Sequence, residues 1–323
     1  MLVLIRYAIL LSLGLVLEVS AYPKPGNVHR FKDFSDVRFE DFIIAGVSAV
    51  HHLHRGIIRG VKLSRNFQLR TVRNVVGDII YGIVRDSMDL SGGGNTSLGT
   101  ALLLAPLSLS IGFLKGSGKF VEQDVRMIAE SARALVERFT TPYDSIMMYR
   151  AVRRASPSYI RKYKPIDTSY PDVWSSSYKR EIIRGNYRLW DILVYSSRYD
   201  VVAREIVEGY KRSIELVKYI GDRVSNHNEW NRVIVETYLY LLSRELDTLI
   251  VRKNGIEAAR YVTDRAGKLH KLCVESWNLC QENLRKFDDE LHRIGVNPGS
   301  TADIVASAIS LYSVSKGRKI IRA

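Results

Sequence analysis

Apolar residues recur at spacings of three and four along almost the whole chain, and this periodicity constrains the fold more than any other feature. Such spacing places apolar side chains on one face of a helix, whereas a half-buried strand requires sustained alternation with a period of two. Sustained alternation does not occur in this sequence. The helical pattern covers residues 39–58, 67–88, 98–114, 121–139, 187–195, 201–219, 230–250, 256–294 and 302–315. The sequence therefore predicts an all-α fold.

Proline and glycine residues interrupt this pattern, but none of the breaks has the composition of a domain linker. The breaks fall at residues 23–25, 92–94, 141–142, 156–171, 254–255 and 298–299. We therefore predict one helical-bundle-like domain over residues 1–323, with about ten or more helices. Residues 156–171 contain three prolines and form the best candidate for a long loop or lid.

The chain is basic, with a formal net charge of +14, 46% hydrophobic residues and 25% charged residues. A charge of this sign favours an anionic partner such as nucleic acid, a membrane surface or a polyphosphate. The basic residues recur at helical spacing and form no continuous tail, which favours a solvated surface with one anion site. We expect neither nucleic acid nor a membrane as a partner. The abundance of Arg, Lys, Glu, Ile and Tyr is typical of heat-adapted proteins.

Cys273 and Cys280 are seven residues apart inside one predicted helix. A continuous helix would separate them by roughly 10 Å, which is too far for a disulfide. No histidine lies at ligand spacing from both, so zinc is not expected. We expect two buried thiols in a reducing compartment.

The N-terminal run of residues 2–17 is strongly apolar, and the following Val-Ser-Ala resembles a signal-peptidase site. Arg6 interrupts this run, Glu18 lies just before the supposed cut, and the remaining segment is shorter than the roughly 20 residues that span a bilayer. We expect a buried first helix and a cytoplasmic protein, with export as the alternative.

Three polar stretches at Pro/Gly breaks point to function. They are Pro-Lys-Pro-Gly-Asn-Val-His at residues 23–29, Gly-Gly-Gly-Asn-Thr-Ser-Leu-Gly at 92–99 and Asn-Pro-Gly-Ser-Thr-Ala-Asp at 297–303. Small residues in turns allow a ligand to approach the backbone, and turns that open helices present unpaired N–H groups to anions. The simplest interpretation is one phosphate-rich ligand site assembled from distant parts of the chain.

The first stretch offers a fixed cation and an unusual carboxylate. Lys24 lies between two prolines, and this stiffened backbone suits a charge aimed at a phosphate. Glu18 lies in the last turn of the predicted first helix, where the helix dipole disfavours a carboxylate. Its placement indicates catalytic use, a metal, or an ion pair with Lys24 or Arg30. Asp33 follows closely and could contribute an oxygen ligand to Mg²⁺.

The other two stretches have structural alternatives. Thr96 or Ser97 could cap the helix that follows the glycines, and the glycine triplet could be only a tight turn between helices. Ser300 is a natural N-cap, with Asp303 in the capping-box position. A fourth cluster, Asp247-Thr248 with Arg252-Lys253, lies near a predicted helix end. Such pairs are often exposed surface residues without a function.

Taken together and in this order, these residues resemble the triphosphoribosyl-dephospho-CoA synthase family. The first matching piece is Leu17-Glu18-Val19 leading into Pro23-Lys24-Pro25-Gly26. The other three are Gly92-Gly93-Gly94-Asn95-Thr96 with Gly99, Asp247-Thr248 with Arg252 and Gly255, and Pro298-Gly299-Ser300-Thr301-Ala302-Asp303. Four ordered matches spread over most of the chain are far more specific than any one of them.

The resemblance implies an all-α transferase that moves the triphosphoribosyl group of ATP to the 2′-hydroxyl of 3′-dephospho-CoA and releases adenine, with Mg²⁺ accompanying ATP. The catalytic candidates are Glu18, Asp247 and Asp303, which could serve as base, as charge stabiliser or in Mg²⁺ binding. The metal candidates are Asp33 and Asp247. The candidates for binding phosphate or nucleotide are Lys24, Gly26, Asn27, His29, Gly93, Gly94, Asn95, Thr96, Arg252, Lys253 and Ser300.

One departure from the family pattern affects the expected substrate. The family usually has His-Lys between the Asn-Thr pair and the closing glycine, where this chain has Ser97 and Leu98. Loss of a cation there predicts a divergent member that uses another acceptor or nucleotide. A non-catalytic nucleotide-binding protein and a basic RNA- or membrane-surface-binding protein remain as alternatives, and a homo-oligomer is also open.

Overall fold

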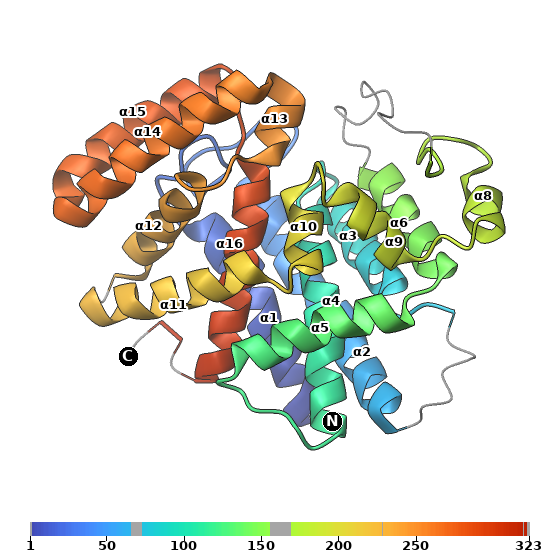
Figure 1. Cartoon of the computed structure of the whole chain (residues 1–323). Helices are drawn as coiled ribbons and strands as arrows, with labels where there is room; N and C mark the ends of the chain where they lie inside the picture. Colours follow the sequence, from blue (N-terminus) through green and yellow to red (C-terminus); the bar gives the residue numbers. More distant parts are fainter. Residues whose placement is uncertain (1, 66–72, 156–168, 228, 319, 322–323) are drawn as a thin grey trace.

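The chain folds into α-helices connected by loops of different lengths (Figure 1). A computed structural model describes residues 2–65, 73–155, 169–227, 229–318 and 320–321. These residues contain fifteen helices and no strand; an isolated bridge between His29 and Lys32 is the one β-type pairing among them. The prediction of an all-α fold is confirmed.

The helices follow one another closely along the chain. They are α1 (Leu2–Ser20), α2 (Phe39–Arg65), α3 (Gly77–Ser91), α4 (Leu98–Gly116), α5 (Val125–Phe139), α6 (Pro142–Ala155), α8 (Tyr178–Arg184), α9 (Leu189–Ser196), α10 (Val201–Val207), α11 (Lys211–Asn226), α12 (Trp230–Leu242), α13 (Thr248–Asn254), α14 (Ile256–Glu275), α15 (Trp277–Arg293) and α16 (Gly299–Lys316).

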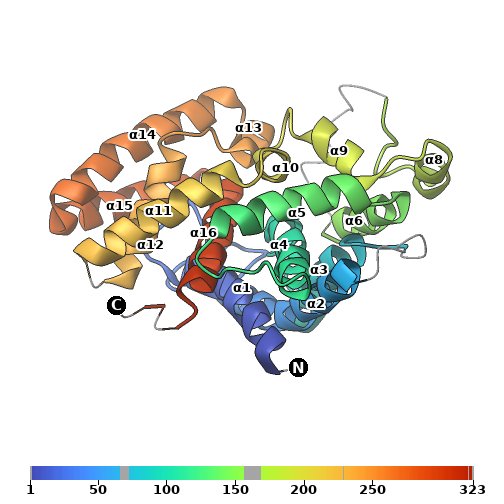
Figure 2. The ribbon, with the colours of Figure 1, turned by 60° about the horizontal axis from the view of Figure 1, so that its bottom comes forward.

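The centre of the molecule is built from α1, α2, α4 and α16, which lie side by side (Figures 1 and 2). Glycine allows α2 and α4 to approach closely: an added methyl group at Gly60 would overlap the Leu109 carbonyl, and one at Gly112 would overlap the Ile57 carbonyl. Gly14 of α1 makes an equally close contact with Ala306 of α16. The small residues in these helices therefore set the spacing of the core.

The N-terminal helix is part of this core, as expected. Tyr7, Leu11 and Leu15 of α1 are buried, and α1 packs against α2 and α16. Among the described residues, one helix, α4, has the length and apolar composition of a membrane span, and 78% of that window is buried inside the protein. Core helices pass the same test.

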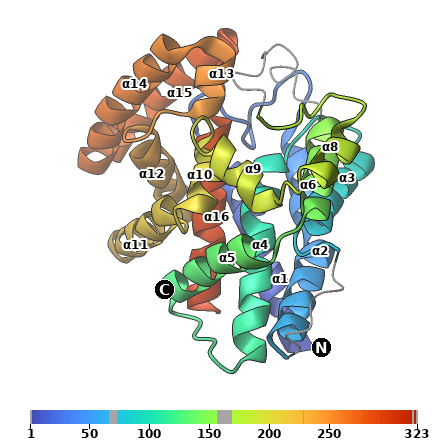
Figure 3. The ribbon, with the colours of Figure 1, turned by 45° about the vertical axis from the view of Figure 1, so that its right-hand side comes forward.

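Two peripheral groups of helices flank the centre (Figure 3). On one side, α14 and α15 form an antiparallel pair beside α12 and α13. On the other side, α6, α8 and α9 pack together near α3 and α5. The N-terminal ends of α4 and α16 lie between these groups.

Three segments predicted as single helices are each divided in two. Residues 201–219 split into α10 and α11 at Gly209 and Tyr210, whose φ angles of 72° and 62° are left-handed. Residues 230–250 split into α12 and α13, with Asp247 capping the second helix. Residues 256–294 split into α14 and α15 at Ser276, whose backbone is extended. Apolar periodicity continues through these breaks, so the pattern alone could not reveal them.

The prediction of two separated thiols at Cys273 and Cys280 is wrong. The helix does not continue between them, because Ser276 turns the chain from α14 into α15. The two Cα atoms are 4.8 Å apart, and the sulfur atoms form a disulfide. Residues 156–168 of the candidate lid, and residues 67–72 of a predicted helix, lie outside the described residues.

Candidate functional site

A pocket of about 870 Å³ opens where the N-terminal ends of α4, α10, α13 and α16 meet the last turn of α1. One end of the pocket is polar and lies against these helix ends. The other end is lined by aromatic and aliphatic side chains of α6, α9 and residues 170–174. The predicted site residues that line the pocket are Glu18, Asn27, Asn95, Thr96, Arg252, Ser300 and Asp303.

Glu18 reaches the pocket from the end of α1, and Lys24 holds it there. The two side chains form an ion pair in which Lys24 is 0% exposed and Glu18 is nearly so. Burial raises the pKa of Glu18, and the charge of Lys24 opposes that rise. Burial likewise lowers the pKa of Lys24, against the influence of Glu18. The structure therefore does not bring Lys24 to the pocket surface, and the sequence prediction of an ion pair between these residues is confirmed.

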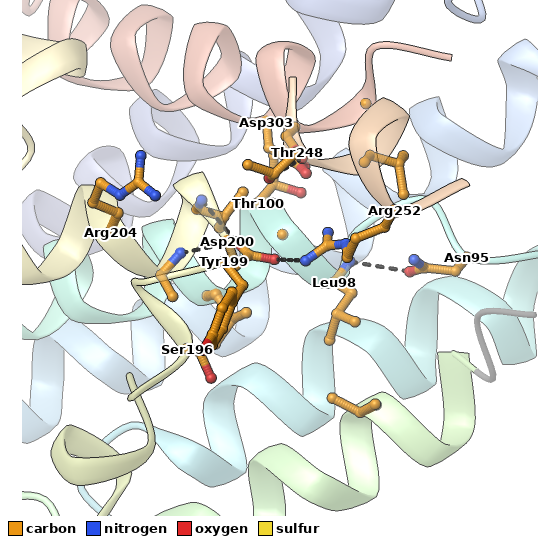
Figure 4. A pocket seen from close by; sticks show the side chains of 18 of the residues that line it. Asn95, Leu98, Thr100, Ser196, Tyr199, Asp200, Arg204, Thr248, Arg252 and Asp303 are labelled. Atoms are coloured by element: carbon orange, nitrogen blue, oxygen red, sulfur yellow. Dashed lines mark hydrogen bonds and ion pairs between the residues drawn. The ribbon is translucent and has the colours of Figure 1, made fainter. Parts of the chain in front are cut away.

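Asp303 lies in the second turn of α16 and faces the start of α4 (Figure 4). An added methyl group at Gly99 would overlap the Asp303 carboxylate. The absence of a side chain at Gly99 therefore allows residues 92–99 and residues 297–303 to pack closely at this point. Burial strongly raises the pKa of Asp303, and the negative charges of Glu18, Asp200 and Asp247 raise it further. Both effects favour the protonated form of this carboxyl group.

Asp200 and Arg252 form an ion pair across the polar end of the pocket (Figure 4). Asp200 also caps α10, accepting hydrogen bonds from the backbone N–H groups of Val202 at 2.8 Å and Ala203 at 3.1 Å. We did not predict Asp200 as a site residue from the sequence. An Asp before an apolar run is a common helix cap, so that signal could have placed the helix start but not its position in the pocket.

Asp247 acts as a cap for two helices at once. One carboxylate oxygen accepts from the N–H groups of Leu249 at 2.9 Å and Ile250 at 3.1 Å, at the start of α13. The other accepts from the N–H of Thr301 at 2.7 Å and its hydroxyl at 2.8 Å, at the start of α16. It does not line the pocket. Asp247 thereby positions the helix that carries Asp303, and the predicted Ser300–Asp303 capping box is replaced by this remote cap.

The glycine triplet forms the tight turn between α3 and α4. Gly92 is the left-handed cap of α3, and the Gly94 N–H donates to the Asp36 carbonyl at 2.9 Å. Gly93 packs against Asp41, and neither Gly93 nor Gly94 lines the pocket. The glycine triplet therefore forms a tight turn between helices, which is the structural alternative that the sequence offered for it.

The residues that follow the triplet do reach the pocket. Ser97 is the N-cap residue of α4, one of the two residues predicted for that position, but its side chain makes no capping hydrogen bond. The Asn95 side-chain oxygen instead accepts from the N–H groups of Ser97 at 3.3 Å and Leu98 at 3.1 Å (Figure 4). The Thr96 and Ser97 hydroxyls instead contact the Ser87 hydroxyl of α3, at 3.0 and 3.2 Å. Leu98 presents an apolar side chain to the pocket.

Gly26 and His29 lie in a separate buried cluster around Asp288 of α15. One Asp288 oxygen accepts from the Gly26 N–H at 2.9 Å, and the other lies 3.1 Å from His29 Nε2. Lys32 and His292 also contact this carboxylate, at 3.2 and 3.0 Å. The cluster fastens the Pro-Lys-Pro-Gly stretch to α15 and does not line the pocket.

The remaining predicted site residues are divided between the pocket and the surface. Asn27 donates to the Asn297 side chain at 3.3 Å, and the Ser300 and Thr248 hydroxyls are 3.3 Å apart at the pocket wall. Asp33 is exposed and accepts from the Phe39 N–H at 2.8 Å, at the start of α2. Lys253 is exposed beyond the pocket lining. Asp33 and Asp247 therefore do not converge, and the described residues contain no group of three acidic, histidine or cysteine side chains that could hold a metal ion.

The aromatic end of the pocket was not predicted from the sequence. Its rings are those of Tyr149, Tyr170, Trp174, Tyr195 and Tyr199. These residues come from three separate segments without a shared motif, and Tyr residues are frequent throughout the chain. Only the tertiary structure brings them together.

Comparisons with known proteins agree with this architecture. A crystal structure from Archaeoglobus fulgidus, provisionally assigned as a triphosphoribosyl-dephospho-coA synthase, has a TM-score of 0.59 and 26% identity, and the match covers 85% of this chain and all of that one. A 2-(5″-triphosphoribosyl)-3′-dephosphocoenzyme-A synthase from Haemophilus ducreyi is 27% identical over 112 residues, or 34% of this chain and 33% of that protein. Its namesake from Escherichia fergusonii is 29% identical over 117 residues, or 35% and 38%. The aligned region thus spans about a third of the length of these two curated relatives.

The family model covers nearly the whole chain. The model described as ATP:dephospho-CoA triphosphoribosyl transferase, CitG, matches residues 5–321. This range includes all four of the ordered motifs from Glu18 to Asp303. The chain therefore belongs to the ATP:dephospho-CoA triphosphoribosyl transferase family.

Proposed function

We propose that this protein transfers the triphosphoribosyl group of ATP to the 2′-hydroxyl of 3′-dephospho-CoA and releases adenine. The observation that carries the proposal is the convergence of Glu18, Asn95, Arg252 and Asp303 on one pocket, from four distant motifs of one family. Membership of this transferase family favours catalysis over non-catalytic nucleotide binding.

The reaction exchanges adenine for the acceptor oxygen at the anomeric carbon, and it requires two proton transfers. The oxygen of the acceptor 2′-hydroxyl forms a bond to C1′ of the ATP ribose and loses its proton. The bond between C1′ and the adenine nitrogen breaks, its electron pair leaves with adenine, and adenine takes up a proton. One carboxylate that accepts a proton and one carboxylic acid that donates one would therefore balance the reaction.

Glu18 and Asp303 suit these two roles because their surroundings differ. Burial raises the pKa of Glu18, but its ion pair with Lys24 opposes that rise and favours the ionised form, which suits a base for the acceptor hydroxyl. Asp303 has carboxylates as its charged neighbours, and burial with these charges raises its pKa, which suits an acid for the departing adenine. Pairs of carboxyl groups with opposed environments commonly divide acid and base roles in this way. In this proposal Lys24 positions Glu18 instead of binding phosphate.

The phosphates would lie on the cationic side of the pocket. Arg252 is held across the pocket by Asp200, and the backbone at the start of α4 is close by. Mg²⁺ would accompany the triphosphate of ATP, but the predicted metal residues do not fit it. Both oxygens of Asp247 are occupied by helix caps, and Asp33 lies outside the pocket lining. We therefore derive no step from a protein-bound metal ion.

Product analysis tests the proposal and also the identity of the acceptor. Incubation with ATP, Mg²⁺ and dephospho-CoA should give dephospho-CoA heavier by one triphosphoribosyl group, together with an equal amount of free adenine. Leu98 stands at a position that the family usually fills with a cation, so CoA and NAD should be tested as acceptors in parallel. Adenine release without any modified acceptor would contradict the proposed transfer.

A further inference from the structure

The aromatic end of the pocket has a fixed shape. The Tyr170 and Tyr195 rings are 4.7 Å apart between centroids, and the Tyr195 and Tyr199 rings are 6.2 Å apart. Tyr199 is 43% exposed although it lies inside the pocket lining. In Figure 4, Tyr199 and Ser196 lie on the side of the pocket opposite Asp303 and Thr248.

The segment facing these rings is fastened to α6. The Tyr149 hydroxyl donates to the Pro171 carbonyl at 2.8 Å. Arg153 donates to the carbonyls of Val173 at 3.0 Å and Ser175 at 3.2 Å. The Trp174 ring therefore belongs to a wall held in place by side-chain hydrogen bonds from α6.

A cation lies at the edge of the same wall. The Arg198 guanidinium is 5.8 Å from the Tyr195 ring centroid, and its side chain is exposed at the pocket. Arg198 has no acidic partner among the ion pairs of the described residues. An aromatic surface beside a cation suits a base attached to phosphates better than it suits a purely apolar chain.

We propose that this aromatic end is an adenine-binding subsite, with Tyr199 as the stacking surface and Arg198 beside the attached phosphates. The inference rests on the proposed function for the identity of the ligands, because both ATP and dephospho-CoA carry adenine. It places base recognition by Tyr199 beside the chemistry at Glu18 and Asp303, because each adenine is attached to a ribose that takes part in the transfer. Stacking on an aromatic face requires no base-specific hydrogen bond, so either nucleotide could supply the ring.

Binding measurements on variants test this subsite. Calorimetric titrations with ATP, dephospho-CoA and 4′-phosphopantetheine, which lacks adenine, would be made on the wild type, Tyr199→Ala, Tyr199→Phe and Trp174→Leu. Tyr261→Ala is a matched control, since Tyr261 is also 43% exposed but lies on α14 outside the pocket. Tyr199→Ala should weaken binding of at least one adenine nucleotide by roughly tenfold, and the nucleotide affected identifies the occupant.

The controls separate stacking from general damage. Tyr199→Phe keeps the ring and should bind within about twofold of the wild type, Trp174→Leu should weaken the same nucleotide, and Tyr261→Ala should change nothing. The subsite is overturned if neither nucleotide binds the wild type, if Tyr199→Ala binds both normally, or if phosphopantetheine binding falls as much as dephospho-CoA binding. Nucleotide binding that depends on Tyr199 but is not followed by adenine release would contradict the proposed function and would still support the subsite.

Discussion

The polar end of the pocket and the Asp288 cluster both gather buried charged groups from distant parts of the chain, but they differ in how those groups are satisfied. Around Asp288, a backbone N–H, two histidines and a lysine contact the two carboxylate oxygens. In the pocket, the charges that most affect Asp303 are those of three carboxylates, one backbone hydrogen bond from Thr100 opposes them, and the side chain remains partly open to the cavity.

Residues of one sequence motif therefore have different roles in these two sites. The Pro-Lys-Pro-Gly-Asn-Val-His stretch sends Gly26 and His29 into the closed cluster and uses Lys24 to hold Glu18 at the pocket. Fully paired polar clusters stabilise one arrangement of the chain, whereas incompletely compensated groups in a cavity are characteristic of functional sites. We therefore expect variants in the cluster to affect stability and variants in the pocket to affect turnover.

Pocket carboxyl variants should show the largest effect. Glu18→Gln and Asp303→Asn should each reduce turnover by about 10²–10⁴-fold, because each removes one proposed proton transfer. The melting temperature should change little, and steady-state kinetics with thermal melting would measure both. Asp289→Asn is the control, since Asp289 is an exposed carboxylate of α15 outside the pocket. An unaltered rate in either variant would remove that residue from the chemistry.

Asp288→Ala should instead lower the stability of the protein more than its turnover. It removes the acceptor shared by Gly26, His29, Lys32 and His292, and should lower the free energy of unfolding by about 3 kcal/mol. Urea denaturation would measure this loss. Asp289→Ala is a close control, because Asp289 also pairs with Lys32 but is 74% exposed, and such pairs contribute under about 1 kcal/mol. Equal losses in the two variants would mean that burial of the cluster is irrelevant.

The disulfide should contribute somewhat less to stability. Cys273 and Cys280 join α14 to α15, the helix that carries Asp288, with a separation of seven residues. Replacing both by Ala should lower the unfolding free energy by about 2 kcal/mol, because a short closed loop constrains the unfolded chain only modestly. Reduction of the wild type should reproduce the loss and leave the double variant unchanged. Free thiols in the purified, non-reduced protein would contradict the pairing.

The smallest effect concerns pH. Burial lowers the pKa of His29, and its hydrogen bond to Asp288 only partly opposes this. The unfolded chain then binds more protons than the folded protein below about pH 6.5, so stability should fall as the pH drops through that range. His52 and His270 shift in the same direction. Melting temperatures between pH 7.5 and 5.5 should therefore fall, and the fall should be shallower in His29→Gln. An equal slope in that variant would exclude His29 as a contributor.

Much of the fold follows from the sequence, because helical periodicity and Pro/Gly breaks are local properties. The divisions at Tyr210 and Ser276 do not follow from it. Tyr210 adopts a left-handed backbone while its buried hydroxyl donates to the Leu103 carbonyl at 2.8 Å, and this contact spans distant parts of the chain. Tertiary contacts of this kind override local helix preference.

The sequence stretches that form the candidate site could be predicted, but the role of each residue within them could not. Sequence order brought Glu18, Asn95, Arg252 and Asp303 into one hypothesis, and all four line the pocket. It could not show that Asp247 caps a helix 54 residues away along the chain. Side-chain direction depends on how helices pack, which local sequence does not encode.

If the open carboxyl groups of the pocket catalyse transfer of the triphosphoribosyl group from ATP to an acceptor, adenine release must depend on that acceptor. The most direct measurement is the rate of adenine release from ATP and Mg²⁺, with and without dephospho-CoA, in the wild type and Asp303→Asn. We expect adenine release only when dephospho-CoA is present, and we expect its rate to be lower by about 10²-fold or more in Asp303→Asn. Release that is independent of the acceptor, or equal in the two proteins, would contradict it.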